Sequence, residues 1–257
     1  MPDRKSPIAV IDSGVGGISV LKELVKILPN ENFIYLGDNE NAPYGTKTTD
    51  EVKDIMFKNV DMMIKEGVKA IVIACNTATA AAAKELREKY IDIPIIGIEP
   101  AIKPSVKYKE NSNVLVMATP LTLKQEKIFD LMDRFSDEVN IITLPCPGLM
   151  ELVDEGEIKG EKIDSFLKEL FAPVKDNKID SVVLGCTHYP HVKDAIIKAI
   201  GKDAMIFDGG EGTARETRRR LEDLDILNDS KNRGQVEIRC SSKKKNIVPL
   251  AKKLLNA

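Results

Sequence analysis

Two short segments place a cysteine in the same local setting. Residues 71–77 and 182–188 each run from an apolar stretch through a small residue to a cysteine, Cys75 or Cys186, and then to two polar residues. In open parallel sheets, ligands bind beyond the carboxyl ends of the strands, and the first N–H groups of the following helix favour an anion there. A thiol at such a point is expected to have a lowered pKa. The alternative is that both cysteines are buried spacers behind buried strands.

A glycine-rich turn after the first apolar stretch adds an acid. Residues 11–17 read Ile-Asp-Ser-Gly-Val-Gly-Gly, and Ser19 stands where a dinucleotide-binding loop would have its third glycine. The carboxylate of Asp12 would repel a phosphate, whereas it suits a cationic amino group or proton transfer. The glycines let backbone N–H groups approach a small anion such as a carboxylate. The simpler alternative is a tight strand-to-helix turn with Ser13 or Asp12 as the N-cap.

Two further clusters of small polar residues follow apolar stretches. They span residues 41–45 and 118–122. Their hydroxyls and backbone N–H groups could hold carboxylate oxygens without adding charge. Taken singly, each cluster is an ordinary turn or helix N-cap.

Two thiols, an aspartate and a histidine, without a metal-binding triad or an intact nucleotide loop, suit racemisation by two bases. A thiolate on one face of a carbon removes a proton and a thiol on the opposite face returns one, so the configuration inverts. Because the α-proton of an amino acid is far less acidic than a thiol, the site must stabilise the carbanion by desolvation, positioning and hydrogen-bond donors. Asp12 and His188 are the neighbours expected to steer the proton of each thiol.

The elements that position these residues alternate in type along the chain. Short runs rich in Val and Ile alternate with longer segments of 3.6-residue period, which is typical of βα units around a parallel sheet. The predicted strands are 8–11, 33–36, 70–74, 95–98, 114–118, 141–144, 181–184 and 205–207. The predicted helices are 21–28, ended by Pro29, and 50–66, 77–89, 121–134, 159–171, 192–200 and 213–224.

Composition and charge exclude several classes of protein. The chain has 257 residues, and its 38 basic and 40 acidic side chains leave a formal net charge of −2, so a nucleic acid is not the expected partner. Basic runs at residues 218–220 and 243–245 could be read as nucleic-acid patches, but acidic neighbours favour a solvated helix face for the first. No uncharged stretch is long enough to span a membrane, and no signal peptide is recognisable.

Cysteine usage agrees with a cytoplasmic location. The four cysteines are sparse and lack the spacings of a zinc site or a disulfide scaffold, so we expect reduced thiols. Cys146 and Cys240 lie outside the repeated setting, and packing explains them best.

Five ordered motifs resemble the glutamate racemases, and the resemblance spans nearly the whole chain. The motifs are Asp12-Ser13-Gly14-x-Gly16-Gly17, Pro43-Tyr44-Gly45, Ala74-Cys75-Asn76-Thr77-Ala78, Thr119 with Thr122, and Gly185-Cys186-Thr187-His188-Tyr189-Pro190. The resemblance implies two Rossmann-like α/β domains with parallel sheets, related by a pseudo-twofold axis and with the active site between them. We expect residues 1–98 plus 208–257 to form the first domain and residues 99–207 the second.

The resemblance also implies the reaction. Glutamate racemases interconvert L- and D-glutamate without pyridoxal phosphate, metal or other cofactor, and they supply D-glutamate for bacterial peptidoglycan. By resemblance, Cys75 takes the α-proton from D-glutamate and Cys186 takes it from L-glutamate, assisted by Asp12 and His188 respectively. The residues that would line the substrate site are Ser13, Pro43, Tyr44, Gly45, Asn76, Thr77, Thr119, Thr122 and Thr187. A homodimer is expected, with a small-molecule substrate and no nucleic-acid or membrane partner.

One position departs from the family pattern. After Cys146 and Pro147 the family usually has Leu-Val-Glu-x-Gly, and here the shorter Asp154 takes the place of the glutamate. We keep Asp154 as a weaker candidate for the site. Three alternatives stay open at this point: a racemase of aspartate or another amino acid, a non-catalytic amino-acid-binding protein on the same fold, and a thiol redox protein. The last is disfavoured because no Cys-x-x-Cys pair is present.

Overall fold

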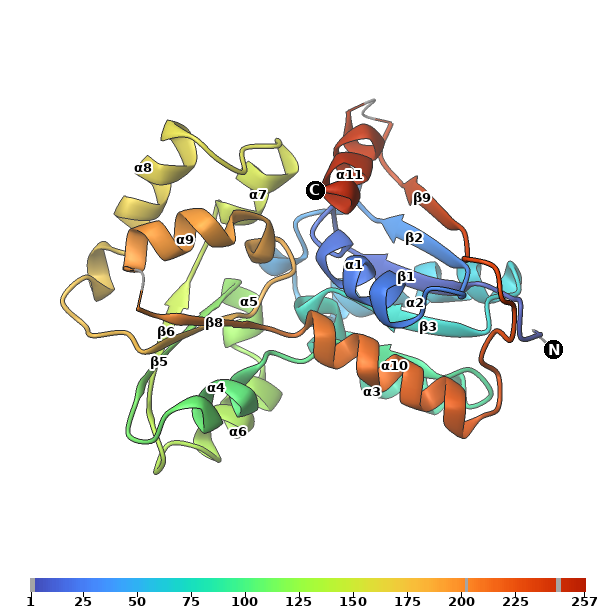
Figure 1. Cartoon of the computed structure of the whole chain (residues 1–257), viewed down its shortest axis with the longest axis horizontal. Coiled ribbons are helices and arrows are strands. Elements are labelled where there is room, and N and C mark those ends of the chain that lie inside the picture. Colours follow the sequence, from blue (N-terminus) through green and yellow to red (C-terminus); the bar gives the residue numbers. More distant parts are fainter. Residues whose placement is uncertain (1–2, 202, 244–245) are drawn as a thin grey trace.

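Two parallel β-sheets lie side by side, each covered by helices on both faces (Figure 1). The computed structural model describes residues 3–201, 203–243 and 246–257, so positions 244–245 of the predicted basic run at 243–245 lie outside the described residues. The strands of both sheets that carry the predicted motifs are almost fully buried, as expected for parallel strands sandwiched between helices.

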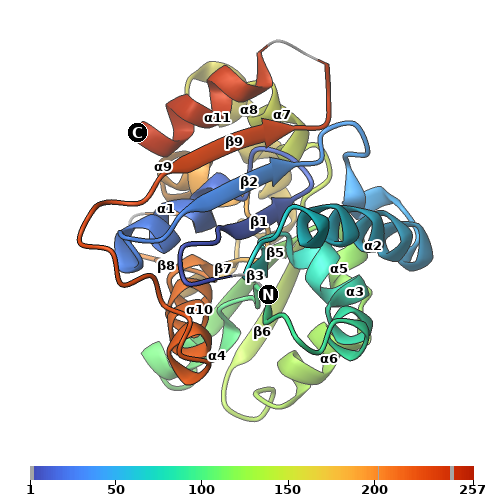
Figure 2. The ribbon, with the colours of Figure 1, turned by 90° about the vertical axis from the view of Figure 1, so that its right-hand side faces the viewer.

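The first sheet has the strand order β4-β3-β1-β2-β9, with all neighbours parallel. Its strands are β1 (Ile8–Asp12), β2 (Phe33–Gly37), β3 (Ala70–Ile73), β4 (Ile95–Gly97) and β9 (Val236–Cys240). The helices α1 (Ile18–Ile27), α10 (Gly210–Asp223) and α11 (Ile247–Asn256) pack on the face that carries Ile8 and Val10. The helices α2 (Thr49–Lys65) and α3 (Asn76–Lys89) pack on the opposite face, which carries Ala9 and Ile11 (Figure 2).

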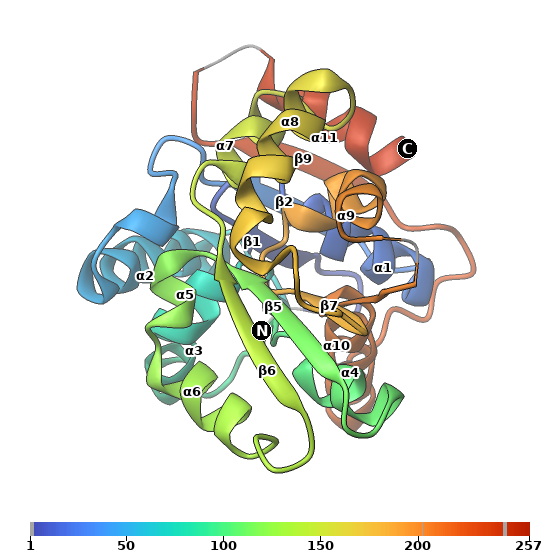
Figure 3. The ribbon, with the colours of Figure 1, turned by 90° about the vertical axis from the view of Figure 1, so that its left-hand side faces the viewer.

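The second sheet has the order β6-β5-β7-β8 and is also parallel (Figure 3). Its strands are β5 (Asn113–Ala118), β6 (Asn140–Pro145), β7 (Ser181–Leu184) and β8 (Met205–Asp208). One face packs against α7 (Leu149–Asp154), α8 (Glu161–Leu170) and α9 (Lys193–Ile200). The other packs against α4 (Ile102–Tyr108) and α6 (Glu126–Asp133). Short helical turns complete the chain: α5 (Pro120–Leu123), η1 (Tyr44–Thr46), η2 (Ala172–Val174) and η3 (Tyr189–Val192).

The two sheets repeat one topology. Strands β5 to β8 can be matched to β1 to β4 in chain order. In both sheets the second strand then lies on one side of the first strand, and the third and fourth strands lie in that order on the other side of the first strand. Cys75 and Cys186 then follow equivalent strands, β3 and β7. The fold class is therefore the predicted one, α/β with two Rossmann-like units related by a pseudo-twofold.

The chain passes between the sheets twice, after β4 and after β8. The two passages touch, because a Cβ added at Gly209 would lie 2.4 Å from the carbonyl oxygen of Glu99. Glycine is required at this close approach of two backbones. The exact domain boundaries at 98/99 and 207/208 stay a prediction.

The strands and most helices lie where the sequence pattern predicts them, with four additions and one division. The edge strand β9 and the helices α4, α7 and α11 were not predicted. The predicted helix 121–134 is instead α5 and α6, separated by Lys124 and Gln125, because the backbone of Gln125 is extended (ψ 131°) and cannot continue a helix.

A buried ion pair anchors the end of the first sheet that lies opposite the thiols. Nζ of Lys69 lies 2.5 Å from Oε2 of Glu31, and both side chains are at most 2% exposed. Lys69 also donates to the carbonyl oxygens of Arg4 and Ile226, while Glu31 accepts from the backbone N–H of Asn228. The extra hydrogen bonds compensate the desolvation of both charges.

No helix in the described part of the chain is long and apolar enough to cross a membrane. The described residues also contain no cluster of His, Cys, Asp and Glu side chains that could hold a metal ion.

Candidate active site

The carboxyl-terminal ends of the two sheets bring the predicted residues together. Cys75 and Cys186 are 6% and 7% exposed, and Asp12 and His188 are each 1% exposed. A negative charge at Cys186 contributes to the pKa of Cys75, so the two sulfurs lie close enough to influence one another. The repeated strand–cysteine segments therefore form one shared site.

Cys75 lies at the N-terminus of α3, where its sulfur accepts a hydrogen bond from the N–H of Ala78 at 3.5 Å and faces Oγ of Ser13 at 3.8 Å. Burial, followed by the charge of Asp12, raises the pKa of Cys75 to about 12, although the contacts with Ala78 and Ser13 act in the opposite direction. The sequence-based expectation of a lowered pKa is therefore wrong for Cys75. The helix N-terminus is outweighed by desolvation and by a neighbouring carboxylate, and Cys75 is a protonated thiol at neutral pH.

Cys186 has a different neighbour. Its sulfur lies 3.7 Å from Nδ1 of His188, whose Nε2 lies 3.1 Å from Oδ1 of Asp154. Burial alone would lower the pKa of His188, but Asp154 and Cys186 outweigh it and raise the pKa well above its ordinary value. The three side chains form a chain in which a charged imidazole can hydrogen-bond the sulfur through one nitrogen and the carboxylate through the other. Asp154 thus reaches His188 despite its short side chain.

The backbone of the glycine-rich turn competes with Asp154 for Nε2 of His188. The N–H of Gly16 points at Nε2 of His188 at 3.2 Å, and the N–H of Val15 donates to Asp154 at 3.2 Å. The Gly16 N–H can donate to Nε2 only when that nitrogen carries no proton, whereas Asp154 accepts from Nε2 only when it does. Proton loss from His188 therefore exchanges one partner for another at a fixed position.

Asp12 connects the two halves of the molecule, the part built around the first sheet and the part built around the second. Its carboxylate accepts hydrogen bonds from the N–H of Gly14 at 2.9 Å and from the hydroxyl of Thr187 at 3.0 Å. Its described hydrogen bonds go to these groups and not to the sulfur of Cys75. The influence of Asp12 on that thiol is electrostatic in this arrangement.

Three threonines form a cluster of neutral hydroxyls between the halves. Oγ1 of Thr77 lies 3.1 Å from that of Thr119 and 2.9 Å from that of Thr122, and the last two are 2.9 Å apart. Gly45 abuts the cluster, because a Cβ there would lie 2.8 Å from Cβ of Thr119. Such a cluster offers hydroxyl donors to a carboxylate without a fixed charge.

Asn76 adds an unused acceptor. It is 5% exposed, and among the described residues its Oδ1 has no hydrogen-bond partner. A buried carbonyl oxygen of this kind is costly unless a ligand donates to it. The other predicted binding residues, Pro43 and Tyr44, lie at the start of η1, next to Gly45.

The two halves are closed tightly over this site. A Cβ at Gly14 would lie 2.8 Å from Oδ2 of Asp154, and one at Gly16 would lie 2.3 Å from Nδ1 of His188. His191 also contacts this turn, because its Nε2 lies 3.2 Å from the carbonyl oxygen of Gly16. The halves therefore pack tightly where the glycine-rich turn meets His188 and Asp154.

Sequence reasoning missed Asp38 and His191, which hold parts of this site in place. Asp38 carried a signal, since it follows β2 directly, much as Asp12 ends β1. His191 lies three residues beyond the predicted His188 and carried no signal of its own.

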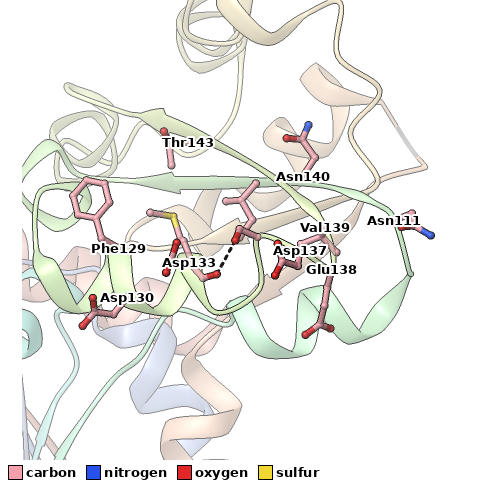
Figure 4. A pocket seen from close by; sticks show the side chains of 12 residues that line it. Asn111, Phe129, Asp130, Asp133, Asp137, Glu138, Val139, Asn140 and Thr143 are labelled. Atoms are coloured by element: carbon pink, nitrogen blue, oxygen red, sulfur yellow. Dashed lines mark hydrogen bonds between the residues drawn. The ribbon is translucent and has the colours of Figure 1, made fainter.

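A prominent surface hollow of about 740 Å³ lies elsewhere, over α6 and β6 (Figure 4). Its lining includes Phe129 and the acidic residues Asp130, Asp133, Asp137 and Glu138. It contains none of the predicted site residues, so its size does not identify it as the site.

Comparison with known proteins identifies the relatives of this chain. The family model for Asp/Glu/Hydantoin racemases matches residues 8–217. A glutamate racemase of Clostridium perfringens is 50% identical over 252 residues, which cover 98% of this chain and 97% of that protein. A glutamate racemase of Clostridium botulinum is 48% identical over 257 residues, the full length of both.

Solved structures are similar over the same length. Glutamate racemase from Francisella tularensis in complex with D-glutamate has a TM-score of 0.85 and 29% identity, covering 99% of this chain and 95% of that one. The Escherichia coli glutamate racemase in complex with L-glutamate and the activator UDP-MurNAc-Ala has a TM-score of 0.87 and 30% identity, covering 97% and 95%.

Proposed function

The chain belongs to the Asp/Glu/Hydantoin racemase family, and on this premise we propose that Cys75 and Cys186 act from opposite faces of the α-carbon of glutamate. The chain is a glutamate racemase, because its relatives of about half identity over the whole length have that activity. The same relatives disfavour the aspartate-specific alternative. The observation that carries the mechanism is the pair of buried thiols at equivalent strand ends.

The unequal surroundings of the thiols suit opposite roles. Starting from L-glutamate, the thiolate of Cys186 takes the α-proton, the C–H electron pair remains on the α-carbon and its carboxylate, and the S–H of Cys75 supplies a proton to the other face. The raised pKa of Cys75 keeps it protonated for that role. Charged His188 can stabilise negative charge on the Cys186 sulfur, 3.7 Å away. From D-glutamate the roles are reversed.

The remaining predicted residues would bind the substrate and the developing charge. The hydroxyl cluster of Thr77, Thr119 and Thr122 is suited to a carboxylate, and the free Oδ1 of Asn76 is suited to the ammonium group. The other binding residues that we propose are Ser13, Pro43, Tyr44, Gly45 and Thr187. Closure removes water, which strengthens each of these interactions.

Three wider statements rest on the family resemblance and stay predictions. The D-glutamate produced would enter bacterial peptidoglycan, the protein would work in the cytoplasm, and it would form a homodimer. The division into domains at residues 98/99 and 207/208 is a prediction of the same standing.

The test is racemisation in deuterated water with no cofactor added. The wild-type protein is expected to convert L-glutamate with deuterium entering the α-position. Cys75→Ser and Cys186→Ser are each expected to abolish conversion without changing the melting temperature.

Each contrary outcome has a distinct meaning. Full activity of either site variant would rule out the two-thiol mechanism. Turnover of aspartate alone would identify the sister activity. A folded, reduced wild-type protein that exchanges no α-hydrogen on either amino acid would identify a binding protein.

A further inference from the structure

Asp38 is a buried carboxylate held entirely by neutral donors. It is 1% exposed and lies directly after β2. It accepts hydrogen bonds from the hydroxyl of Tyr44 at 2.6 Å, Nδ2 of Asn41 at 3.0 Å, Nδ2 of Asn59 at 3.2 Å and the hydroxyl of Ser241 at 2.7 Å. Within the described residues, no lysine or arginine forms an ion pair with it. A buried charge held in this way depends on these hydrogen bonds, because the loss of one leaves the charge incompletely compensated.

The donors come from segments that are far apart in sequence. Tyr44 begins η1, Asn59 lies on α2, and Ser241 follows β9 at the far end of the chain. Ser241 also accepts a hydrogen bond from the N–H of Glu40 at 3.0 Å. It therefore holds the loop between β2 and η1 at two residues, Asp38 and Glu40. Asp38 is therefore the point where the C-terminal segment meets the loop that leads to the substrate site.

The position of Asp38 connects it to the reacting groups on two sides. Its backbone N–H donates to the carbonyl oxygen of Asp12 at 2.8 Å. Through Tyr44 it holds Gly45, which abuts Thr119 of the hydroxyl cluster. A shift of Tyr44 would therefore move the wall against which the substrate carboxylate is proposed to bind.

We propose that Asp38 is a positioning residue for the substrate-binding turn Pro43-Tyr44-Gly45, and that Ser241 couples this turn to the C-terminal segment. The inference rests on the proposed function, because it assigns a role in glutamate binding. The described hydrogen bonds of Asp38 include neither Cys75 nor Cys186. It acts by giving the Tyr44 hydroxyl a single strong acceptor.

The chemistry of the cluster makes Asp38→Asn a sharp test. All side-chain partners of Asp38 are donors, and an amide offers them one acceptor oxygen and an NH₂ group that cannot accept. At least one donor then loses its partner while the shape of the side chain is kept. Tyr44→Phe removes the same hydrogen bond from the other side.

The experiment measures kcat and KM for both enantiomers of glutamate in Asp38→Asn, Tyr44→Phe and the double variant. A hydrogen bond to a buried charge is worth about a tenfold change or more in affinity, so KM is expected to rise at least about tenfold in each single variant. The change in kcat should be smaller. The double variant should resemble the single ones, because all three lack the same contact.

The chain offers a matched control. Tyr90 donates a hydrogen bond to Asp61 between α3 and α2, outside the site. Asp61→Asn and Tyr90→Phe make the same chemical changes there and should leave KM unchanged. Melting temperatures of all variants are recorded so that kinetics are compared on folded protein.

The outcomes separate this inference from the proposed function. A wild-type protein that does not racemise glutamate overturns both. An active wild type with an unchanged KM in Asp38→Asn, including one with only a lowered melting temperature, overturns the positioning role alone. If Asp38→Asn does not fold, the milder Ser241→Ala decides: a raised KM supports the role, and an unchanged KM overturns it.

Discussion

Replacing Gly16 by alanine would place a methyl group against the ring of His188. The added Cβ would lie 2.3 Å from Nδ1, 2.6 Å from Cε1 and 2.7 Å from Cγ of that ring. The backbone of Gly16 is not in the left-handed region, so it accepts alanine without strain. The substitution is therefore a purely steric perturbation of the contact between the two halves.

The size of the effect follows from these distances. Ordinary carbon contacts lie at about 3.5 to 4.0 Å, so the ring must retreat by about 1 Å or the halves must stay apart by as much. Either response disturbs the 3.7 Å contact with Cys186 and the 3.1 Å contact with Asp154. A misplacement of about 1 Å can cost about 100-fold in rate, which corresponds to about 2.7 kcal/mol of activation free energy.

The assay is the rate of loss of optical rotation from L-glutamate and from D-glutamate, with kcat expected to fall about 100-fold in both directions. The melting temperature should change little, because the clash arises only where the halves meet. Gly212→Ala is the matched control, since a Cβ there on α10 meets nothing within 4 Å. Near-normal kcat in a folded Gly16→Ala protein would refute the claim that this closed contact belongs to the reacting arrangement.

Two further predictions concern stability. Burial, followed by the charge of His188, lowers the pKa of His191 to about 4 from its ordinary value of 6.5. Unfolded protein therefore binds the proton more tightly, so this contribution to the unfolding free energy is complete above pH 6.5 and falls by up to about 3 kcal/mol as pH drops towards 4. Urea unfolding across this pH range should show this loss of unfolding free energy in the wild type and a smaller loss in His191→Gln. An equal dependence of the unfolding free energy on pH in the two proteins would contradict the assignment. Lys69→Met leaves Glu31 buried without its cation and should cost about 3 to 5 kcal/mol, largely recovered when Glu31→Gln is added. If Lys69→Met is as stable in urea as the wild type, the ion pair contributes nothing to the free energy of unfolding.

The main strands could be predicted because each is a continuous apolar run bounded by turn residues. β9 carries a different signal, since Val236, Ile238 and Cys240 alternate with charged residues, which is typical of a half-buried edge strand and not of the continuous apolar runs from which the other strands were predicted. Its place beside β2 depends on a pairing across some 200 residues of chain. No local pattern encodes such a contact.

The meeting of the candidate side chains was predictable, but their electrostatic arrangement was not. The repeated strand–cysteine segments and the Asp12 turn predicted which side chains meet, because carboxyl ends of parallel strands share an edge. The raised pKa of Cys75 depends on how deeply the two halves bury it. The role of Asp38 depends on Ser241, whose approach follows from the position of β9.

The unlike surroundings of the two thiols have a thermodynamic consequence. L- and D-glutamate are mirror images and have equal free energies in water, so the equilibrium constant is one and kcat/KM must be the same in both directions. Asp12 beside one sulfur and the His188–Asp154 pair beside the other can make kcat and KM differ between the enantiomers, but never their ratio. A substitution beside either sulfur must therefore slow both directions by the same factor in kcat/KM, and asymmetry can appear only in how each direction divides that factor between binding and turnover.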